Sequence, residues 1–122
     1  MRDDSGSNFL VDTDVFVDHI RGARRVPRIA GSYSVITRWE LFAGDEKEEP
    51  AVRGLLALHE QIGVDDAIAE RAGRMRRAAP GLRTPDALIA ATALEHDLEL
   101  ITRNSRDFAG IRGLRLRDPA TL

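Results

Sequence analysis

Short apolar runs that end at a polar or acidic residue alternate along this sequence with stretches whose apolar residues have helical spacing. Residues 9–11 form one such run, which ends at Asp12, and residues 98–101, apolar except for Glu99, form another, which ends at Thr102. Strands buried in a parallel sheet have continuous apolar sequences, and helices connect them across both faces of the sheet. The alternation therefore predicts an α/β fold with a central, mainly parallel sheet.

Five strands and five helices are expected from these patterns. The predicted strands cover residues 9–11, 32–36, 62–64, 98–102 and 114–116, and the predicted helices cover residues 15–20, 37–43, 52–62, 67–79 and 84–96. Thr84 is predicted as the N-cap of the last helix, with Pro85 at its first position, and Thr37 is predicted to open the second. Gly22 is predicted to end the first helix, and residues 105–108 to form a turn.

The chain has the size and composition of one globular domain. Its 122 residues are 43% hydrophobic and 31% charged, which is typical of a folded chain with a single core. We expect a disordered N-terminal tail over residues 1–7 and one domain over residues 8–122. No apolar run reaches the length of a membrane span, and the first residues lack the apolar segment of a signal peptide, so a cytoplasmic location is expected.

The metal-binding chemistry open to the chain is restricted by its composition. It has no cysteine and only three histidines, so disulfides and thiolate metal sites are excluded. Any metal would be held mainly by oxygen ligands, which suit hard cations such as Mg²⁺ or Mn²⁺.

Carboxylates from four separate segments fall where strands end or helices begin. Ligands of open parallel sheets bind outside the carboxyl ends of the strands, at the point where the strand order reverses. The four residues are Asp12, Glu40, Asp86 and Asp107. Such a cluster would repel itself without a divalent cation, so the sequence predicts an Mg²⁺ or Mn²⁺ site.

Each of these acids also has a purely structural interpretation, which is weakest for Asp12 because a partly buried acid after an apolar strand needs a partner. Thr37 and Glu40 match a capping box, in which Glu40 would bond only to the Thr37 amide. Asp86 suits the first turn of a helix because of the helix dipole, and Asp107 could cap a short turn. The combination of all four is more specific than any one of them.

The sequence resembles the PIN-domain ribonucleases, and in particular the VapC toxins of bacterial toxin–antitoxin pairs. The similarity lies in four blocks that occur in the family's order and span nearly the whole chain: residues 9–16, 34–44, 84–93 and 100–108. The resemblance implies a PIN-like three-layer α/β/α sandwich, an Mg²⁺- or Mn²⁺-dependent endoribonuclease that cuts RNA, a homodimer, and inhibition by a cognate VapB-like antitoxin.

The resemblance also implies roles for individual residues. It places the family's first three acids at Asp12, Glu40 and Asp86. Many members have the fourth acid where this chain has Asn104, so Asp107 is taken as the fourth charge and Asn104 as a supporting polar group. Thr13, Asp14 and Thr102 are expected to support the carboxylates. Candidates for binding the RNA backbone are Arg21, Arg83 and Arg103, together with Arg24 and Arg25.

Parts of the sequence also fit two other functions. The segment Asp12–Thr13–Asp14 also resembles the opening motif of haloacid-dehalogenase-type phosphatases, and an acid after the first strand is found in response-regulator receivers. Both of those families use a lysine on a late strand, whereas the only lysine of this chain, Lys47, lies in the acidic segment 45–50. A PIN fold kept as an interaction module with a decayed site is disfavoured because Asp12, Glu40 and Asp86 are all present.

Overall fold

The computed structural model describes residues 8–22 and 31–122. Its sheet has five strands in the order β3-β2-β1-β4-β5, and every pair of neighbours is parallel. The strands are β1 (Phe9–Val11), β2 (Ser32–Ser34), β3 (Glu60–Ile62), β4 (Glu99–Ile101) and β5 (Leu116–Arg117). The predicted parallel sheet is confirmed.

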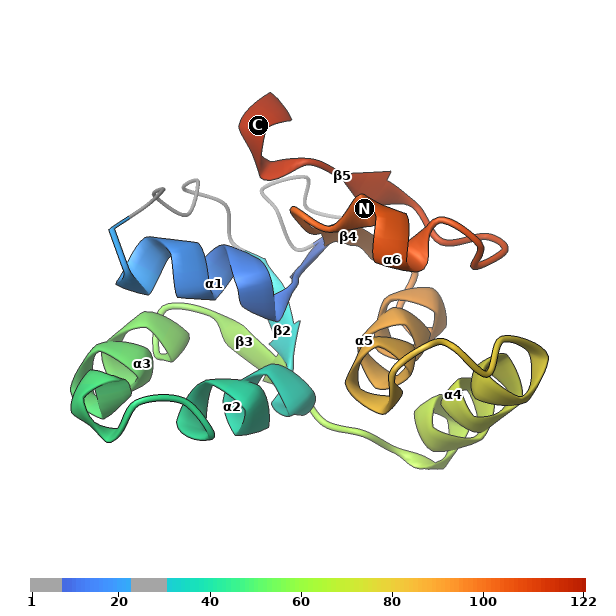
Figure 1. Ribbon diagram of the computed structural model, residues 1–122, viewed down its shortest axis with the longest axis horizontal. Coiled ribbons are helices and arrows are strands. Elements are labelled where there is room, and N and C mark those ends of the chain that lie inside the picture. Colours follow the sequence, from blue (N-terminus) through green and yellow to red (C-terminus); the bar gives the residue numbers. More distant parts are fainter. Residues whose placement is uncertain (1–7, 23–30) are drawn as a thin grey trace, which may run out of the picture.

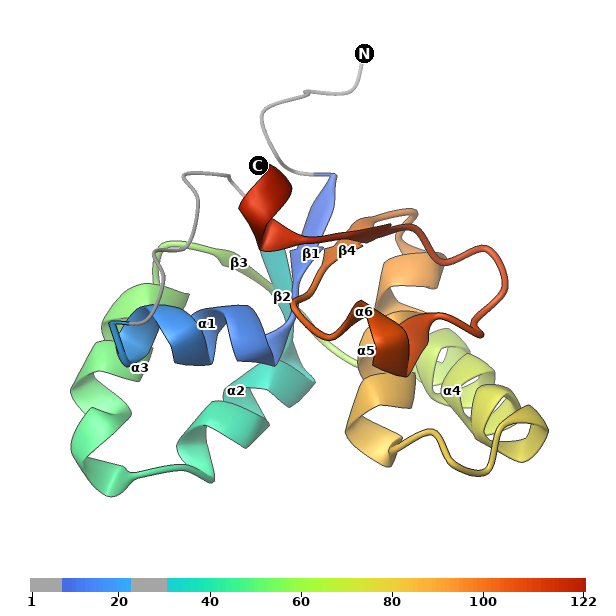
Figure 2. The ribbon, with the colours of Figure 1, turned by 45° about the horizontal axis from the view of Figure 1, so that its top comes forward.

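Helices pack on both sides of this sheet and give three layers (Figures 1 and 2). One side carries α1 (Thr13–Ile20), α2 (Val35–Phe42) and α3 (Glu49–Leu56), and the other carries α4 (Asp66–Ala78), α5 (Thr84–Glu95) and the one-turn α6 (Ser105–Phe108). Two 3₁₀ turns, η1 (Glu46–Glu48) and η2 (Pro119–Thr121), complete the described elements. The α/β/α sandwich is confirmed.

Apolar cores fill the space between the sheet and each helical layer. Leu10 and Leu100 belong to the core under α5, whereas their neighbours Val11 and Ile101 belong to the core under α1, α2 and α3. Successive strand residues point to opposite faces, so a strand covered on both sides needs apolar residues at consecutive positions. This explains the continuous apolar runs of the sequence.

The starts of two helices differ from the predictions. Ser34 caps α2 by accepting a hydrogen bond from the Ile36 amide at 3.0 Å, so the helix begins at Val35 and Thr37 is a buried residue inside it. Thr84 is the first residue of α5, after the N-cap Arg83, and makes no side-chain capping bond. The predicted N-cap roles of Thr37 and Thr84 are therefore wrong.

Smaller differences concern the ends of other elements. The strand predicted at residues 62–64 is β3 at Glu60–Ile62, because Ser34 pairs with Ile62 and Val64 is exposed. The turn predicted at residues 105–108 is the helix α6, and the helix predicted at residues 52–62 is α3, which ends at Leu56. Gly22 does end α1, with a φ of 74° that favours glycine.

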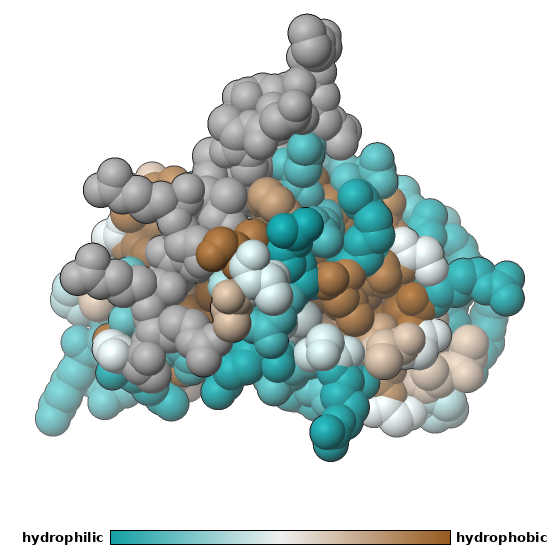
Figure 3. All heavy atoms as spheres, turned by 90° about the horizontal axis from the view of Figure 1, so that it is seen from above, coloured by the Kyte–Doolittle hydropathy of each residue, from teal (hydrophilic) through white to brown (hydrophobic). Residues whose placement is uncertain are grey.

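The predicted N-terminal tail, residues 1–7, and the RNA-binding candidates Arg24 and Arg25 lie outside the described residues. No helix in the described ranges is long and apolar enough to cross a membrane. On the face shown in Figure 3, hydrophilic side chains surround apolar atoms that remain visible between them. Trp39 on α2 is the largest exposed apolar side chain of the described residues, with 59% of its surface accessible.

Candidate active site

The strand order reverses between β1 and β4, and the residues that follow these two strands lie side by side. The Asp12 amide donates to the Ile101 carbonyl at 2.9 Å, which fixes Asp12 against the end of β4. A cavity of about 250 Å³ opens at this edge of the sheet. It is lined by Asp12, Thr13, Asp14, Val17, Glu40, Arg83, Asp86, Arg103, Asn104, Asp107 and Phe108. We refer to it below as the carboxylate pocket.

The carboxylate pocket brings together nearly all the residues selected from the sequence. The four acids Asp12, Glu40, Asp86 and Asp107 line it from β1–α1, α2, α5 and α6. Of the supporting residues, Thr102 is fully buried next to Asp12 rather than at the cavity wall. Arg21 is not among the lining residues; it lies at the far end of α1, where its Nε is 3.9 Å from Glu48 Oε2.

Asp12 is the most buried of these acids. Its Oδ1 accepts from the Thr13 amide and its Oδ2 from the Thr102 hydroxyl, each at 2.8 Å. Burial raises the pKa of Asp12 to about 7, and the negative charge of Asp14 adds to this shift. The ionised form of Asp12 is thus disfavoured until a positive charge reaches it.

Asp14 and the segment after β4 form the next part of the pocket. Thr102 Oγ1 lies 3.3 Å from Asp14 Oδ2, farther than from Asp12, and it accepts a hydrogen bond from the Asn104 amide at 3.1 Å. Burial raises the pKa of Asp14, although the Arg103 amide and charge oppose this shift. The Arg103 guanidinium itself is turned to Asp18, with Nε 3.3 Å from Oδ2.

Glu40 is held by two threonines. Thr13 Oγ1 donates to Glu40 Oε1 at 2.6 Å and lies 2.9 Å from the hydroxyl of the fully buried Thr37. Because the Thr13 hydroxyl donates its only proton to Glu40, the Thr37 hydroxyl must donate the hydrogen bond between the two threonines. The chain Thr37–Thr13–Glu40 orients one carboxylate oxygen, and the other lies 3.8 Å from Arg83 Nη2.

Asp86 lies close enough to three other acids for their charges to affect its pKa. Burial raises its pKa, and the like charges of Glu40, Asp107 and Asp14 contribute in the same direction, while Arg83 opposes them. The acids that come from distant parts of the sequence therefore act on one another across the same cavity.

The donor set fits a hydrated divalent cation. Within the described residues no three Asp, Glu or His side chains are arranged to enclose a metal ion by themselves. Mg²⁺ is usually bound through only one or two carboxylates and keeps several waters. Asp12, with a pKa raised by burial and by a neighbouring carboxylate, is a ligand whose charge such an ion would stabilise.

Comparison with known proteins agrees with this geometry. Residues 9–114 match the family model of the PIN domain. The chain belongs to the PIN-domain family. A relative named Ribonuclease VapC19, from Mycobacterium tuberculosis, is 33% identical, with 81% of this chain and 90% of the relative covered.

Solved structures show the same PIN fold. A toxin–antitoxin complex from Klebsiella pneumoniae contains a chain that is 36% identical, with a TM-score of 0.73 and coverage of 90% of this chain and 96% of that one. A DNA-bound VapBC from Salmonella typhimurium contains a chain that is 25% identical, with a TM-score of 0.80 and coverage of 92% and 98%. PIN-domain ribonucleases are, as a family, metal-dependent.

Two residues of this PIN-domain site were missed from the sequence. Thr37 is predicted only as a helix cap, although it precedes Glu40 by three residues, which places both on one side of a helix. Asp18, the ion-pair partner of Arg103, lies four residues after Asp14 and one turn further along α1. Helical spacing from a predicted site residue is the signal that would have found both.

Proposed function

We propose that this chain is a metal-dependent endoribonuclease of the VapC type, which hydrolyses phosphodiester bonds in RNA. The observation that carries the proposal is that Asp12, Glu40, Asp86 and Asp107 all line one cavity where the strand order reverses. The relative named as a ribonuclease covers most of the chain and supports the reaction class.

The burial and contacts of the four acids suggest which of them would bind the metal ion directly and which would act through water. Asp12 and Asp86 would hold Mg²⁺ or Mn²⁺ directly, and Glu40 and Asp107 would act through water or on a second ion. When bound, the ion supplies a Lewis acid for the phosphate oxygens and lowers the pKa of the attacking water. Thr102 keeps the Asp12 carboxylate in place, and Thr13 does the same for Glu40.

The arginines of the pocket suit a phosphate substrate. Arg83 lies at its rim, 69% exposed, and only loosely contacts Glu40, so it is free to reach an RNA phosphate. Arg103 also lines the pocket but is held by Asp18, and would contact the backbone from that position. Asn104, whose backbone amide donates to the Thr102 hydroxyl, also lines the pocket.

The alternative functions find little support in this arrangement. Lys47 lies exposed in η1 and does not line the carboxylate pocket, so the lysine of a phosphatase or receiver site has no counterpart there. A decayed interaction module would not need four acids around one cavity.

The test is cleavage of single-stranded RNA by the purified chain in Mg²⁺ or Mn²⁺. We expect chelation by EDTA to abolish cleavage and Asp86→Asn to reduce it at least 100-fold. The matched control is Asp66→Asn, which removes an exposed aspartate from the first turn of α4, outside the pocket. Undiminished cleavage in EDTA, or by Asp86→Asn, would overturn the proposal.

The proposed partners are a cognate VapB-like antitoxin and a second copy of the chain. The support is that structural relatives are toxin–antitoxin complexes. Co-expression with the product of an adjacent small gene should yield a complex without RNA cleavage, and sedimentation of the isolated chain should give twice 13.5 kDa. A monomer at micromolar concentration would contradict the dimer.

A further inference from the structure

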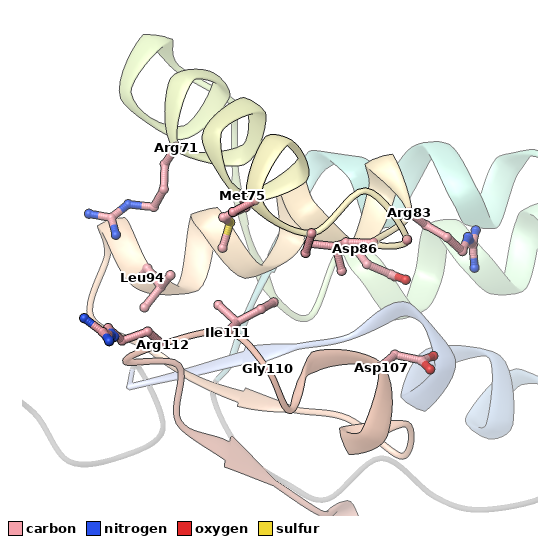
Figure 4. Close-up of a pocket in the computed structure, with 13 residues that line it drawn as sticks. Arg71, Met75, Arg83, Asp86, Leu94, Asp107, Gly110, Ile111 and Arg112 are labelled. Atoms are coloured by element: carbon pink, nitrogen blue, oxygen red, sulfur yellow. The ribbon is translucent and has the colours of Figure 1, made fainter.

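A second and larger cavity, of about 710 Å³, opens beside the carboxylate pocket. It lies between α4, α5 and the segment that follows α6 (Figure 4). Arg83, Asp86 and Asp107 line both cavities, so the larger one is a continuation of the candidate active site. We call it the side cavity. Its volume is within the range of about 300–1,000 Å³ typical of ligand-binding pockets.

The two ends of the side cavity differ in chemistry. Figure 4 shows Asp86, Asp107 and Arg83 at one end and Arg71 and Arg112 at the other. Between them the wall is mainly apolar, with side chains from α4, the α4–α5 loop, α5 and the segment after α6. These apolar residues are Met75, Leu82, Leu94 and Ile111.

The arginines at the far end are available to an anion. Arg71 forms an ion pair with Glu95 through its Nε, and this pair holds the guanidinium at the cavity. The other N–H groups of the guanidinium remain able to donate to an anion. Arg112 is exposed and forms no ion pair with any of the residues that the structure describes. An anion that extends from the carboxylate pocket would meet these two arginines after crossing the apolar wall.

We propose that the side cavity binds the nucleotide next to the scissile phosphate of a single-stranded RNA. Its base packs on Met75, Leu94 and Ile111, and its outer phosphate lies between Arg71 and Arg112. This inference rests on the proposed function, since it places the scissile phosphate at the carboxylate pocket. A single strand is required because a base in a duplex is stacked and cannot lie on a protein wall.

Nucleic acid fits the side cavity better than an acidic peptide for one reason. The cavity leads directly to carboxylates that would repel peptide acids but would bind, through a cation, the phosphate adjoining the nucleotide. Beyond those carboxylates the side cavity offers an apolar wall on which a base can pack and two arginines that can bind a phosphate.

Two substitutions probe the side cavity without touching the four acids. Arg112→Ala removes the proposed phosphate contact. Gly110→Phe fills the cavity, because Gly110 lines it and a Cβ added there meets no atom within 4 Å. Gly81→Phe, at another lining glycine with open space, replaces Gly110→Phe if that variant fails to fold.

Matched controls lie on α4 outside the side cavity. Arg77→Ala removes the same charge from an exposed position, and Gly73→Phe adds the same ring where a Cβ also meets no atom within 4 Å. Neither residue lines either cavity.

The first measurement is the binding of a fluorescent single-stranded RNA to each variant in an Asp12→Asn background, which prevents cleavage. We expect the affinity to fall about tenfold in Arg112→Ala and Gly110→Phe and to stay within twofold in the controls. Arg112→Ala should also lower the slope of log affinity against log salt by about 0.7, the value for one phosphate contact on a single strand.

The second measurement is RNA cleavage by the same variants with Asp12 intact. Equal RNA affinity in all variants would overturn the side-cavity proposal, whether or not the chain cleaves RNA. It would indicate that the cavity binds a protein partner instead. Reduced affinity in the cavity variants without any cleavage by the unaltered chain would overturn the nuclease proposal and retain the binding site. Absence of RNA binding in the parent protein would overturn both.

Discussion

Asp12 combines burial, a neighbouring like charge and a position against the end of β4. Its pKa of about 7 in the folded state lies above the ordinary value of 3.8, so the folded chain keeps a proton that the unfolded chain has released. Between about pH 4 and pH 7 the free energy of unfolding therefore falls as the pH rises, by up to about 1.4 kcal/mol for each unit of pKa shift.

Asp12→Asn should remove this pH-dependent loss of unfolding free energy and should also abolish RNA cleavage. We expect the variant to melt at a higher temperature than the unaltered chain in EDTA at pH 8, and the difference to shrink as the pH falls toward 5. Thermal melts at several pH values and an RNA cleavage assay measure the two effects. Loss of cooperative melting in Asp12→Asn would show instead that the carboxylate is needed for folding.

Thr37 makes a second prediction at the level of single residues. Thr37→Val keeps the shape of this buried side chain but removes the hydroxyl that donates to Thr13, so the Thr13 hydroxyl that bonds to Glu40 is held less firmly. We expect kcat to fall about tenfold with little change in KM, and the unfolding free energy to fall by about 1 kcal/mol. Thr37→Ser should restore kcat. A variant that loses stability while kcat is unchanged would assign Thr37 to the core alone.

These residues also show how far the sequence predicts the site. The four acids could be placed because each follows a strand or begins a helix, and such positions meet at one edge of a parallel sheet. The interaction of Glu40 could not be assigned, because Thr37 and Glu40 match both a capping box and a pair on one helical face. The choice between these two interpretations depends on whether β2 ends at Ser34 or later. The end of β2 is decided by its pairing with β3.

At the scale of elements, the beginnings of α2 and α5 have different chemistry. Ser34 is fully buried and bonds to the Ile36 amide, whereas Thr84 is exposed and caps no amide. We expect Ser34→Ala to cost about 1 kcal/mol of unfolding free energy and Thr84→Ala to cost much less. Denaturant titrations of the two variants measure the difference. Equal losses would contradict the N-cap assignment of α2.

The types of the elements were predictable, but several of their ends were not. Strands of three residues such as β1 and β4 are recognised because both faces are covered: β1 is entirely apolar, and β4 is apolar after its first residue, Glu99. β3 contains Glu60 and Gln61, which are exposed, and so has no apolar run to mark it. Its position is set by pairing with β2, a long-range contact that a local pattern does not contain.

At the scale of the whole molecule, the two helical layers meet around the site. Glu40 comes from the layer of α1, α2 and α3, whereas Asp86 and Asp107 come from the layer of α4, α5 and α6. A cation bound among these acids would connect the two layers, and any ligand that binds only the folded chain raises its stability. Binding of the proposed cofactor would thus be thermodynamically coupled to folding.

This coupling gives the last prediction. Mg²⁺ or Mn²⁺ at 100 times its dissociation constant should stabilise the chain by about 2.7 kcal/mol, which is visible as a higher melting temperature. The shift should be larger at pH 8 than at pH 6, because protons compete with the cation for Asp12 when the pH is below its pKa of about 7. Asp12→Asn should lose most of the shift, whereas Asp66→Asn, a change of the same charge on the exposed start of α4, should keep it. A melting temperature that does not respond to either cation at pH 8 would mean that the acids are stabilised by the protein alone, and the metal assignment would fail independently of any RNA assay.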